Sequence, residues 1–172
     1  VGYVLRLVFD KQRQAVRFSH LLVLPSRQMA ETVRRCYEGE DGRSLEERSM
    51  ILPWGGWSEP VDEAAVAAEA ARLRSHYQLR PATRVVMTLS RISPEKGLHL
   101  LLEGLRRLEQ SPLGRGIEVT AFICGETAFM RGEAYGRRVR GAADRLKRFR
   151  AFFPGYLAGS AKQAYFRLAD LF

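Results

Sequence analysis

The chain has 172 residues, of which 46% are hydrophobic, and a formal net charge of +9. This length allows one or two domains with a sizeable core, and no run of about 18 apolar residues suggests a membrane span. The first residues, Val1-Gly2-Tyr3, contain neither a Met nor a signal-peptide pattern, so we expect an interior piece of a cytoplasmic protein.

The first third of the chain predicts two helices and two short strands. Apolar residues at helical spacing over 3–18 predict an amphipathic helix, and the apolar run 20–24 predicts a short buried strand. Ser26 is a good N-cap for a helix over 27–37. After a polar, Gly-containing loop, residues 50–52 predict a second brief strand.

The segment Pro53–Pro60, which reads P-W-G-G-W-S-E-P, is the strongest break in the sequence. Its Pro and Gly residues and its lack of periodicity predict a turn or linker. We therefore expect a domain over 1–52, a linker over 53–60 and a second domain over 61–172.

The second domain alternates helix and strand patterns, which predicts a parallel sheet with flanking helices, a Rossmann-like α/β fold. Strands are expected at 85–89, 117–124 and 151–153. Helices are expected at 63–77, 96–108, 131–150 and 161–169. Asp62 and Ser160 are the expected N-caps of the first and last helices. Gly136 or Gly141 should break or kink the third helix, and residues 169–172 should begin a further strand.

The loops that follow parallel strands meet at one edge of the sheet, outside the carboxyl ends of the strands. Arg91 and Lys96 lie in the first of these loops, beside a helix N-terminus, and such cations with free N–H groups suit a diphosphate. Taken alone, an Arg and Lys pair in a loop is as often a surface pair. Further residues expected at this edge are Gly125, Glu126, Gly155 and Lys162.

The segment Ser90–Gly97, which reads S-R-I-S-P-E-K-G, resembles the signature G-R-L/I-x-x-x-K-G of retaining GT-B glycosyltransferases. The resemblance is to the family 4 group, which includes sucrose synthases and many bacterial sugar transferases. In that family the Arg and the Lys hold the diphosphate of a nucleotide sugar, so the resemblance implies this role for Arg91 and Lys96. Ser90 stands where the family usually has Gly, which can alter the approach of the backbone to a phosphate.

Other segments over 20–172 are similar to the same family. Pro53 and Gly55 match its interdomain hinge, and the final A-D-L-F matches the entry to its next strand. C-G-E loosely matches a Gly-rich turn, and F-F-P-G-Y-L resembles a turn whose backbone holds the nucleotide base. The resemblance thus implies a donor site formed by Arg91, Lys96, Gly97, Gly125, Glu126, Gly155, Tyr156, Leu157 and Lys162.

The resemblance implies a hexosyltransferase that moves a sugar, with retention, from a UDP-, GDP- or ADP-sugar to a sugar or other hydroxyl acceptor. Arg91 and Lys96 would be its catalytic cations and would stabilise the leaving diphosphate without a metal or cofactor. The domain over 1–52 would be the end of the acceptor-side domain, and 61–172 a truncated donor domain. A glutamate pair that the family has beyond A-D-L-F does not follow here, so we expect a fragment that is inactive alone. It would join the rest of the enzyme or associate with itself across the cut edge of the sheet.

The cysteines and histidines predict no metal centre. Cys36 and Cys124 fall in different predicted elements without metal-ligand spacing, so we expect two free thiols in a reducing compartment. The three histidines are isolated, and the sequence has no Asp-x-Asp motif. His99, in the first turn after Gly97, is more typical of a packing or surface residue than of a ligand.

A second hypothesis rests on the basic segment Arg131–Arg150, which holds eight Arg or Lys residues and two acidic residues. Such a segment is typical of a module that docks on nucleic acid or on an anionic membrane, here at its inner face. Phe129, Tyr135 and Phe149 are interleaved with these charges but do not follow a recognisable nucleic-acid-binding spacing. A solvated helix face is the commoner role for such charges, and we do not expect nucleic acid as a partner.

Overall fold

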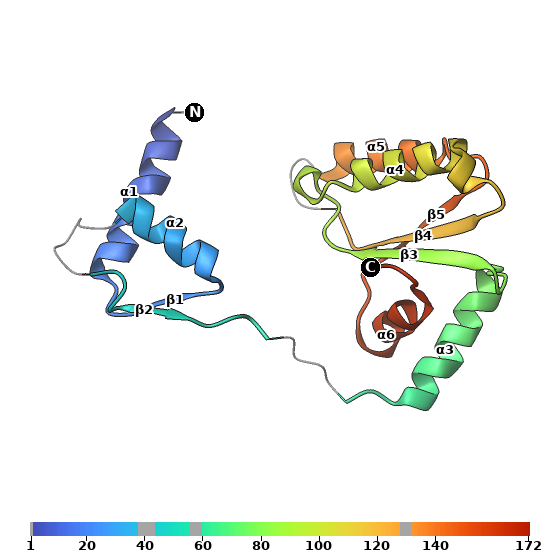
Figure 1. Cartoon of the computed structure of the whole chain (residues 1–172), viewed down its shortest axis with the longest axis horizontal. Coiled ribbons are helices and arrows are strands. Elements are labelled where there is room, and N and C mark those ends of the chain that lie inside the picture. Colours follow the sequence, from blue (N-terminus) through green and yellow to red (C-terminus); the bar gives the residue numbers. More distant parts are fainter. Residues whose placement is uncertain (1, 38–43, 56–59, 128–131) are drawn as a thin grey trace. The chain divides into compact units, whose positions relative to one another are not determined.

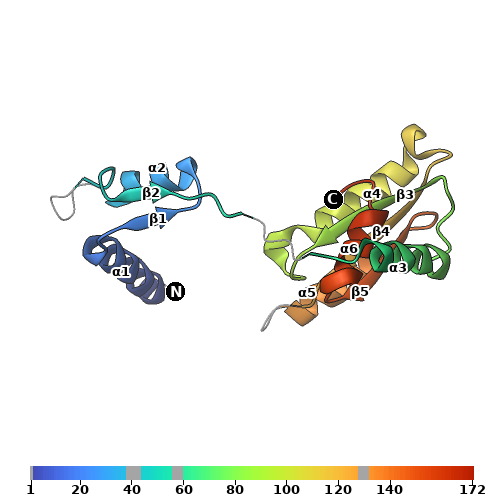
Figure 2. The ribbon, with the colours of Figure 1, turned by 90° about the horizontal axis from the view of Figure 1, so that it is seen from below.

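The structure is a computed structural model that describes residues 2–37, 44–55, 60–127 and 132–172. The chain divides into two compact units, Val1–Ser58 and Glu59–Phe172, which are described one at a time (Figures 1 and 2). Of the expected linker, residues 56–59 lie outside the described ranges. None of the helices within those ranges combines the length and apolar character needed to span a bilayer.

The first unit contains two helices and a two-stranded parallel sheet. Its elements in chain order are α1 (Gly2–Phe18), β1 (Leu22–Leu24), α2 (Arg27–Tyr37) and β2 (Ser49–Ile51). Leu22 of β1 lies opposite Ser49 of β2. The Ser26 hydroxyl accepts the N–H of Met29 at 3.1 Å, which confirms Ser26 as the N-cap of α2.

The strand predicted over 20–24 is shorter and more exposed than expected. Val23, in its middle, is 53% exposed. The side chains of β1 alternate between partly buried and exposed, because the described residues of this unit do not cover one face of the narrow sheet. The buried Arg48 ties the unit together, since its Nη1 donates to the carbonyl oxygens of Val16 at 2.6 Å and Ser19 at 2.9 Å near the end of α1.

The second unit is a three-layer α/β structure, which confirms the predicted Rossmann-like sheet with flanking helices (Figure 1). Its parallel strands, in the spatial order β3-β4-β5, are β3 (Thr83–Leu89), β4 (Glu118–Cys124) and β5 (Arg150–Gly155). Its α-helices are α3 (Glu63–His76), α4 (Leu98–Gln110), α5 (Gly132–Ala143) and α6 (Gly159–Leu168). α4 and α5 cover one face of the sheet, and α3 and α6 cover the other.

The central strand β4 explains why the sequence folds into three layers. Val119, Ala121 and Ile123 pack against α4 and α5. Phe122 and Cys124, which point to the opposite face, pack against α3 and α6. A parallel strand that is covered on both faces must be apolar at nearly every position, and the sequence of β4 meets this requirement.

The predicted further strand at the C-terminus begins beside β3. Leu171 forms a parallel bridge with Val86, and its carbonyl accepts the N–H of Met87 at 2.8 Å. The Asp170 carboxylate accepts the N–H of Val85 at 2.7 Å. This segment therefore satisfies part of the hydrogen bonding at the β3 edge of the sheet.

Details of two predicted helices were wrong. The helix predicted over 131–150 is α5, which ends at Ala143 because the chain turns there toward β5, and it passes through Gly136 and Gly141 without a break; a Cβ at Gly136 would lie 2.8 Å from Cγ2 of Thr127. Ser160 is not an N-cap, because it lies inside α6, which begins at Gly159. The N-cap is Ala158, and it makes no side-chain cap hydrogen bond. By contrast, Asp62 caps α3 as predicted, with its carboxylate accepting two backbone N–H groups.

Candidate functional site

A pocket of about 520 Å³ opens at the carboxyl edge of the sheet, beside the ends of β3, β4 and β5. Six of the residues expected in the site line it, namely Arg91, Gly125, Glu126, Tyr156, Leu157 and Lys162. Leu89, Ser90 and Thr127 complete the lining. Lys96, Gly97 and Gly155 do not line this pocket: Lys96 ends a short 3-10 helix, η1 (Pro94–Lys96), and is exposed.

Backbone hydrogen bonds hold the loops after the three strands against one another. The N–H of Ser90 donates to the carbonyl of Cys124 at 3.0 Å, and the N–H of Ile92 donates to the carbonyl of Glu126 at 2.7 Å. The Gly125 N–H donates to the Gly155 carbonyl at 2.7 Å. Since each loop is fixed to the next through main-chain atoms, the rim of the pocket is preorganised.

Gly125 is the position where a side chain would prevent this contact between loops. Its φ of 129° lies in a region that L residues rarely adopt, and a Cβ built on it would collide with the carbonyl oxygen of Ser90. Gly97, with φ of 66°, is both the C-cap of η1 and the N-cap of α4, so it sets the direction in which α4 leaves the site. These two glycines position the loop that carries Arg91.

The charges of Arg91 and Lys96 both affect the pKa of Glu95, which lies between them in the sequence of the β3–α4 loop. The pKa of the Glu95 carboxyl is lowered by its interaction with the Ser93 side chain, by its own backbone N–H, and then by the charges of Arg91 and Lys96. Arg91 faces the pocket from this loop, while Lys96 lies beyond the lining.

The opposite wall of the pocket comes from the β5–α6 loop. Lys162 lies in the first turn of α6 and is partly buried, and Tyr156 is 73% exposed. The pocket thus has a guanidinium on one wall and an ammonium on the other, and among the described residues that line it Glu126 is the only acidic one. The charge of this lining suits an anionic ligand.

Thr127 is one of three lining residues that were not predicted for the site, together with Leu89 and Ser90. It follows directly after the Gly125-Glu126 turn, and its backbone bridges to Ile92 of the neighbouring loop. The signal available in the sequence was a residue with a hydroxyl group directly after the Gly125-Glu126 turn, at the end of a predicted strand. His99, in contrast, does not line the pocket: its Nδ1 lies 2.8 Å from the Tyr135 hydroxyl of α5, and it serves packing between the helices as expected.

Comparisons with known proteins give similarity at the level of structure. No protein-family model matches the sequence, and no curated protein matches it either. The structure of HepE from Anabaena in complex with UDP-glucose has 22% identity and a TM-score of 0.64, with 91% of this chain and 38% of that chain covered. The apo structure of OtsA has 14% identity and a TM-score of 0.69, with 94% and 40% covered.

A third structure, a UDP-forming α,α-trehalose-phosphate synthase from Burkholderia xenovorans, has 14% identity and a TM-score of 0.62, with 93% and 41% of the two chains covered. The chain spans about two fifths of the length of these structures. At such identities the likeness concerns the fold. The chain is structurally similar to retaining GT-B glycosyltransferases, and its α/β fold matches a Rossmann-like domain of those enzymes.

Proposed function

We propose that the intact protein is a retaining glycosyltransferase and that residues 61–172 bind its nucleotide-sugar donor. The observation that carries the proposal is the pocket at the carboxyl edge of the sheet, where Arg91 and Lys162 line one cavity beside the Gly125 turn. Ligands of open α/β sheets bind in this place. The similarity to structures that were solved with UDP and with UDP-glucose supports the same ligand class here.

The proposed chemistry is departure of a nucleoside diphosphate from the anomeric carbon of the sugar. Negative charge builds up on the diphosphate in the transition state, and fixed cations stabilise it. Arg91 contacts the diphosphate from the pocket wall, Lys96 approaches it from the rim beyond the lining, and Lys162 faces it from α6. Side-chain cations perform this task in the proposal, which therefore needs no metal ion.

The β5–α6 loop is proposed to hold the nucleoside. Gly155 has φ of 83° at the end of β5, and the next two residues, Tyr156 and Leu157, line the pocket, where we propose that their backbone groups contact the base. Glu126, from the β4 loop, is the acidic residue placed to accept hydrogen bonds from a sugar or ribose hydroxyl. Gly125 has no side chain and so lets a phosphate approach the rim of the pocket, and Gly97 is proposed to position the β3–α4 loop that carries the two cations.

We also propose which domain of the intact protein each part of the chain belongs to. Residues 1–52 belong to the acceptor-side domain, 53–60 form the linker, and 61–172 form the donor domain. Because this chain spans about two fifths of the matching structures, the acceptor and the complete reaction are proposed for the intact protein only. The chain alone is expected to bind donor without turning it over.

Calorimetric titration of the full chain with UDP, GDP and ADP tests the donor site. We expect Arg91→Ala and Lys96→Ala each to weaken the nucleotide that binds best by about tenfold or more, since each removes a charge-assisted hydrogen bond. Arg115→Ala is the matched control, because Arg115 is an exposed arginine that precedes β4, at the other end of the strands. Unchanged affinity in both site variants would refute the donor role of this loop.

A further inference from the structure

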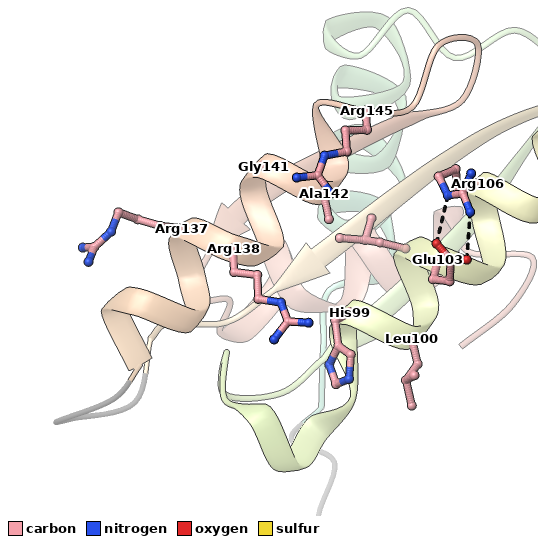
Figure 3. A pocket seen from close by; sticks show the side chains of 10 residues that line it. His99, Leu100, Glu103, Arg106, Arg137, Arg138, Gly141, Ala142 and Arg145 are labelled. Atoms are coloured by element: carbon pink, nitrogen blue, oxygen red, sulfur yellow. Dashed lines mark hydrogen bonds and ion pairs between the residues drawn. The ribbon is translucent and has the colours of Figure 1, made fainter.

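A second and larger pocket, of about 760 Å³, lies between α4 and α5 on one face of the sheet, away from the candidate donor site (Figure 3). None of its lining residues lines the pocket at the strand ends. In Figure 3, Arg138 extends from α5 toward His99 of α4, so the two helices face each other across this groove. We call it the α4–α5 groove.

The lining of the α4–α5 groove is strongly basic. Four arginines contribute to it, namely Arg106, Arg137, Arg138 and Arg145. Glu103 is its acidic residue, and this carboxylate accepts hydrogen bonds from Arg106 at 2.9 Å and from Arg107 at 2.8 Å. These two guanidinium groups lower the pKa of Glu103 to about 2, so Glu103 is fully charged near neutral pH. Its carboxylate is already bonded to arginines of its own helix.

Three of the groove arginines have no such acidic partner. Within the described part of the chain, Arg137, Arg138 and Arg145 form no ion pair or side-chain hydrogen bond. All three lie on α5 or in the turn after it and line the groove, so their positive charges are available to an anionic ligand.

His99 lines the groove from α4, opposite the arginines of α5. The Tyr135 hydroxyl accepts the backbone N–H of His99 at 3.2 Å and lies 2.8 Å from its Nδ1. These contacts with Tyr135 fix the orientation of the His99 ring, which lines the groove and lies beside Arg138 in Figure 3.

We propose that the α4–α5 groove binds a phosphate group, carried either by a membrane lipid or by a soluble phosphorylated compound. Guanidinium groups bind phosphate oxygens through paired hydrogen bonds, and a concave site of this volume suits a compact ligand. The proposal concerns a site separate from the candidate donor site and does not depend on it.

The same groove is poorly suited to single-stranded nucleic acid. Such binding relies on exposed aromatic rings on which bases stack, but Tyr135 and Phe149 are only 7% and 3% exposed. Phe129, the third aromatic residue of this stretch, lies outside the described residues. Leu100, which lines the groove and is 66% exposed, instead offers an apolar contact at its rim.

The test uses the full chain with Arg91→Ala as background, so that binding at the candidate donor site is weakened and is the same in all variants that are compared. Inorganic pyrophosphate is titrated by calorimetry, and vesicles of phosphatidylcholine with and without phosphatidylglycerol are assayed by co-sedimentation. We expect Arg138→Gln with Arg145→Gln to weaken binding by about tenfold or more. The matched control is Arg74→Gln with Arg115→Gln, which removes the same charge from exposed sites outside the groove and should change affinity less than twofold.

The variant Gly141→Gln distinguishes binding inside the groove from nonspecific attraction of an anion to a positively charged surface. Gly141 lines the groove, and a Cβ there would meet no atom within 4 Å, so a glutamine fills the space without changing the charge. We expect it to weaken binding as much as the double arginine variant does. If the groove variants lose pyrophosphate binding, the ligand is a soluble phosphate compound. If they lose vesicle binding, and Leu100→Gln weakens vesicle binding as well, the ligand is a lipid headgroup. The proposal is overturned if neither probe binds, if both double variants weaken binding equally, or if Gly141→Gln has no effect.

Discussion

The Glu109 carboxylate of α4 accepts the backbone N–H of Phe149 at 2.7 Å, and this contact joins the end of α4 to the start of β5. The same carboxylate also accepts the N–H groups of Lys147 and Arg148. Glu109 is buried, with 8% of its surface exposed. Because a buried loop N–H without a partner is costly, we expect Glu109→Ala to reduce the free energy of unfolding by about 2–4 kcal/mol, as judged by urea denaturation.

The same contact predicts how stability varies with pH. Burial by itself would raise the pKa of Glu109, but the N–H groups of Phe149, Arg148 and Lys147 outweigh it, so the pKa in the folded protein is lower than the ordinary 4.5. The contribution of Glu109 to stability is therefore complete above that ordinary value and is lost as the pH falls through the folded pKa. Glu109→Gln should unfold with a flatter dependence on pH below 4.5 than the unmodified chain. Parallel curves for the two proteins would argue against this linkage.

Gly125→Ala tests whether close contact between loops shapes the candidate donor site. The new Cβ would collide with the carbonyl oxygen of Ser90 at a φ of 129°. We expect a loss of about 2–4 kcal/mol in the free energy of unfolding and a displaced β4–α5 loop. Gly104→Ala is the control, since a Cβ at that exposed helical position meets no atom within 4 Å and should stabilise α4 by up to about 1 kcal/mol. Equal stability of the two variants would contradict the proposed role of Gly125.

Asp170→Ala probes the C-terminal segment that pairs with β3. Its carboxylate accepts the N–H of Val85, and its ion pair with Arg84, at 3.4 Å on the surface, should contribute little. We expect a loss of about 0.5–1.5 kcal/mol and faster hydrogen exchange at Met87, whose N–H donates to the Leu171 carbonyl. Arg84→Ala should leave that exchange rate nearly unchanged. If Arg84→Ala accelerates exchange at Met87 as much as Asp170→Ala does, the ion pair rather than the Val85 contact holds the segment.

The fold could be predicted because its signals are local. The bounds of α2 follow from Ser26 and the periodicity after it, and the apolar sequence of β4 requires cover on both faces of the sheet. Right-handed crossovers then place Arg91, Gly125 and Lys162 at one edge, where the structure has a common pocket. These inferences need only the chain order of the elements.

The remaining features depend on contacts between residues that are distant in the sequence. Gly136 was read as a helix breaker, because nothing in its local sequence indicates that Thr127 packs against it. The basic segment after residue 131 could not be recognised as one side of a groove, since its other side comes from α4, some forty residues earlier. Likewise, spacing alone could not show that Lys96 lies beyond the lining that contains Arg91.

The two cysteines should report on the packing of the second unit. Cys36 is exposed on α2, whereas Cys124 is fully buried in β4, and burial raises the pKa of the Cys124 thiol to about 12. Because the thiolate is the reactive form, we expect Ellman's reagent to label one thiol rapidly in the native chain and both in denaturant. Cys36→Ser should abolish the rapid reaction and leave labelling that is limited by the opening of β4. Rapid labelling of Cys124 in that variant would show that β4 is not the closed centre of the sheet.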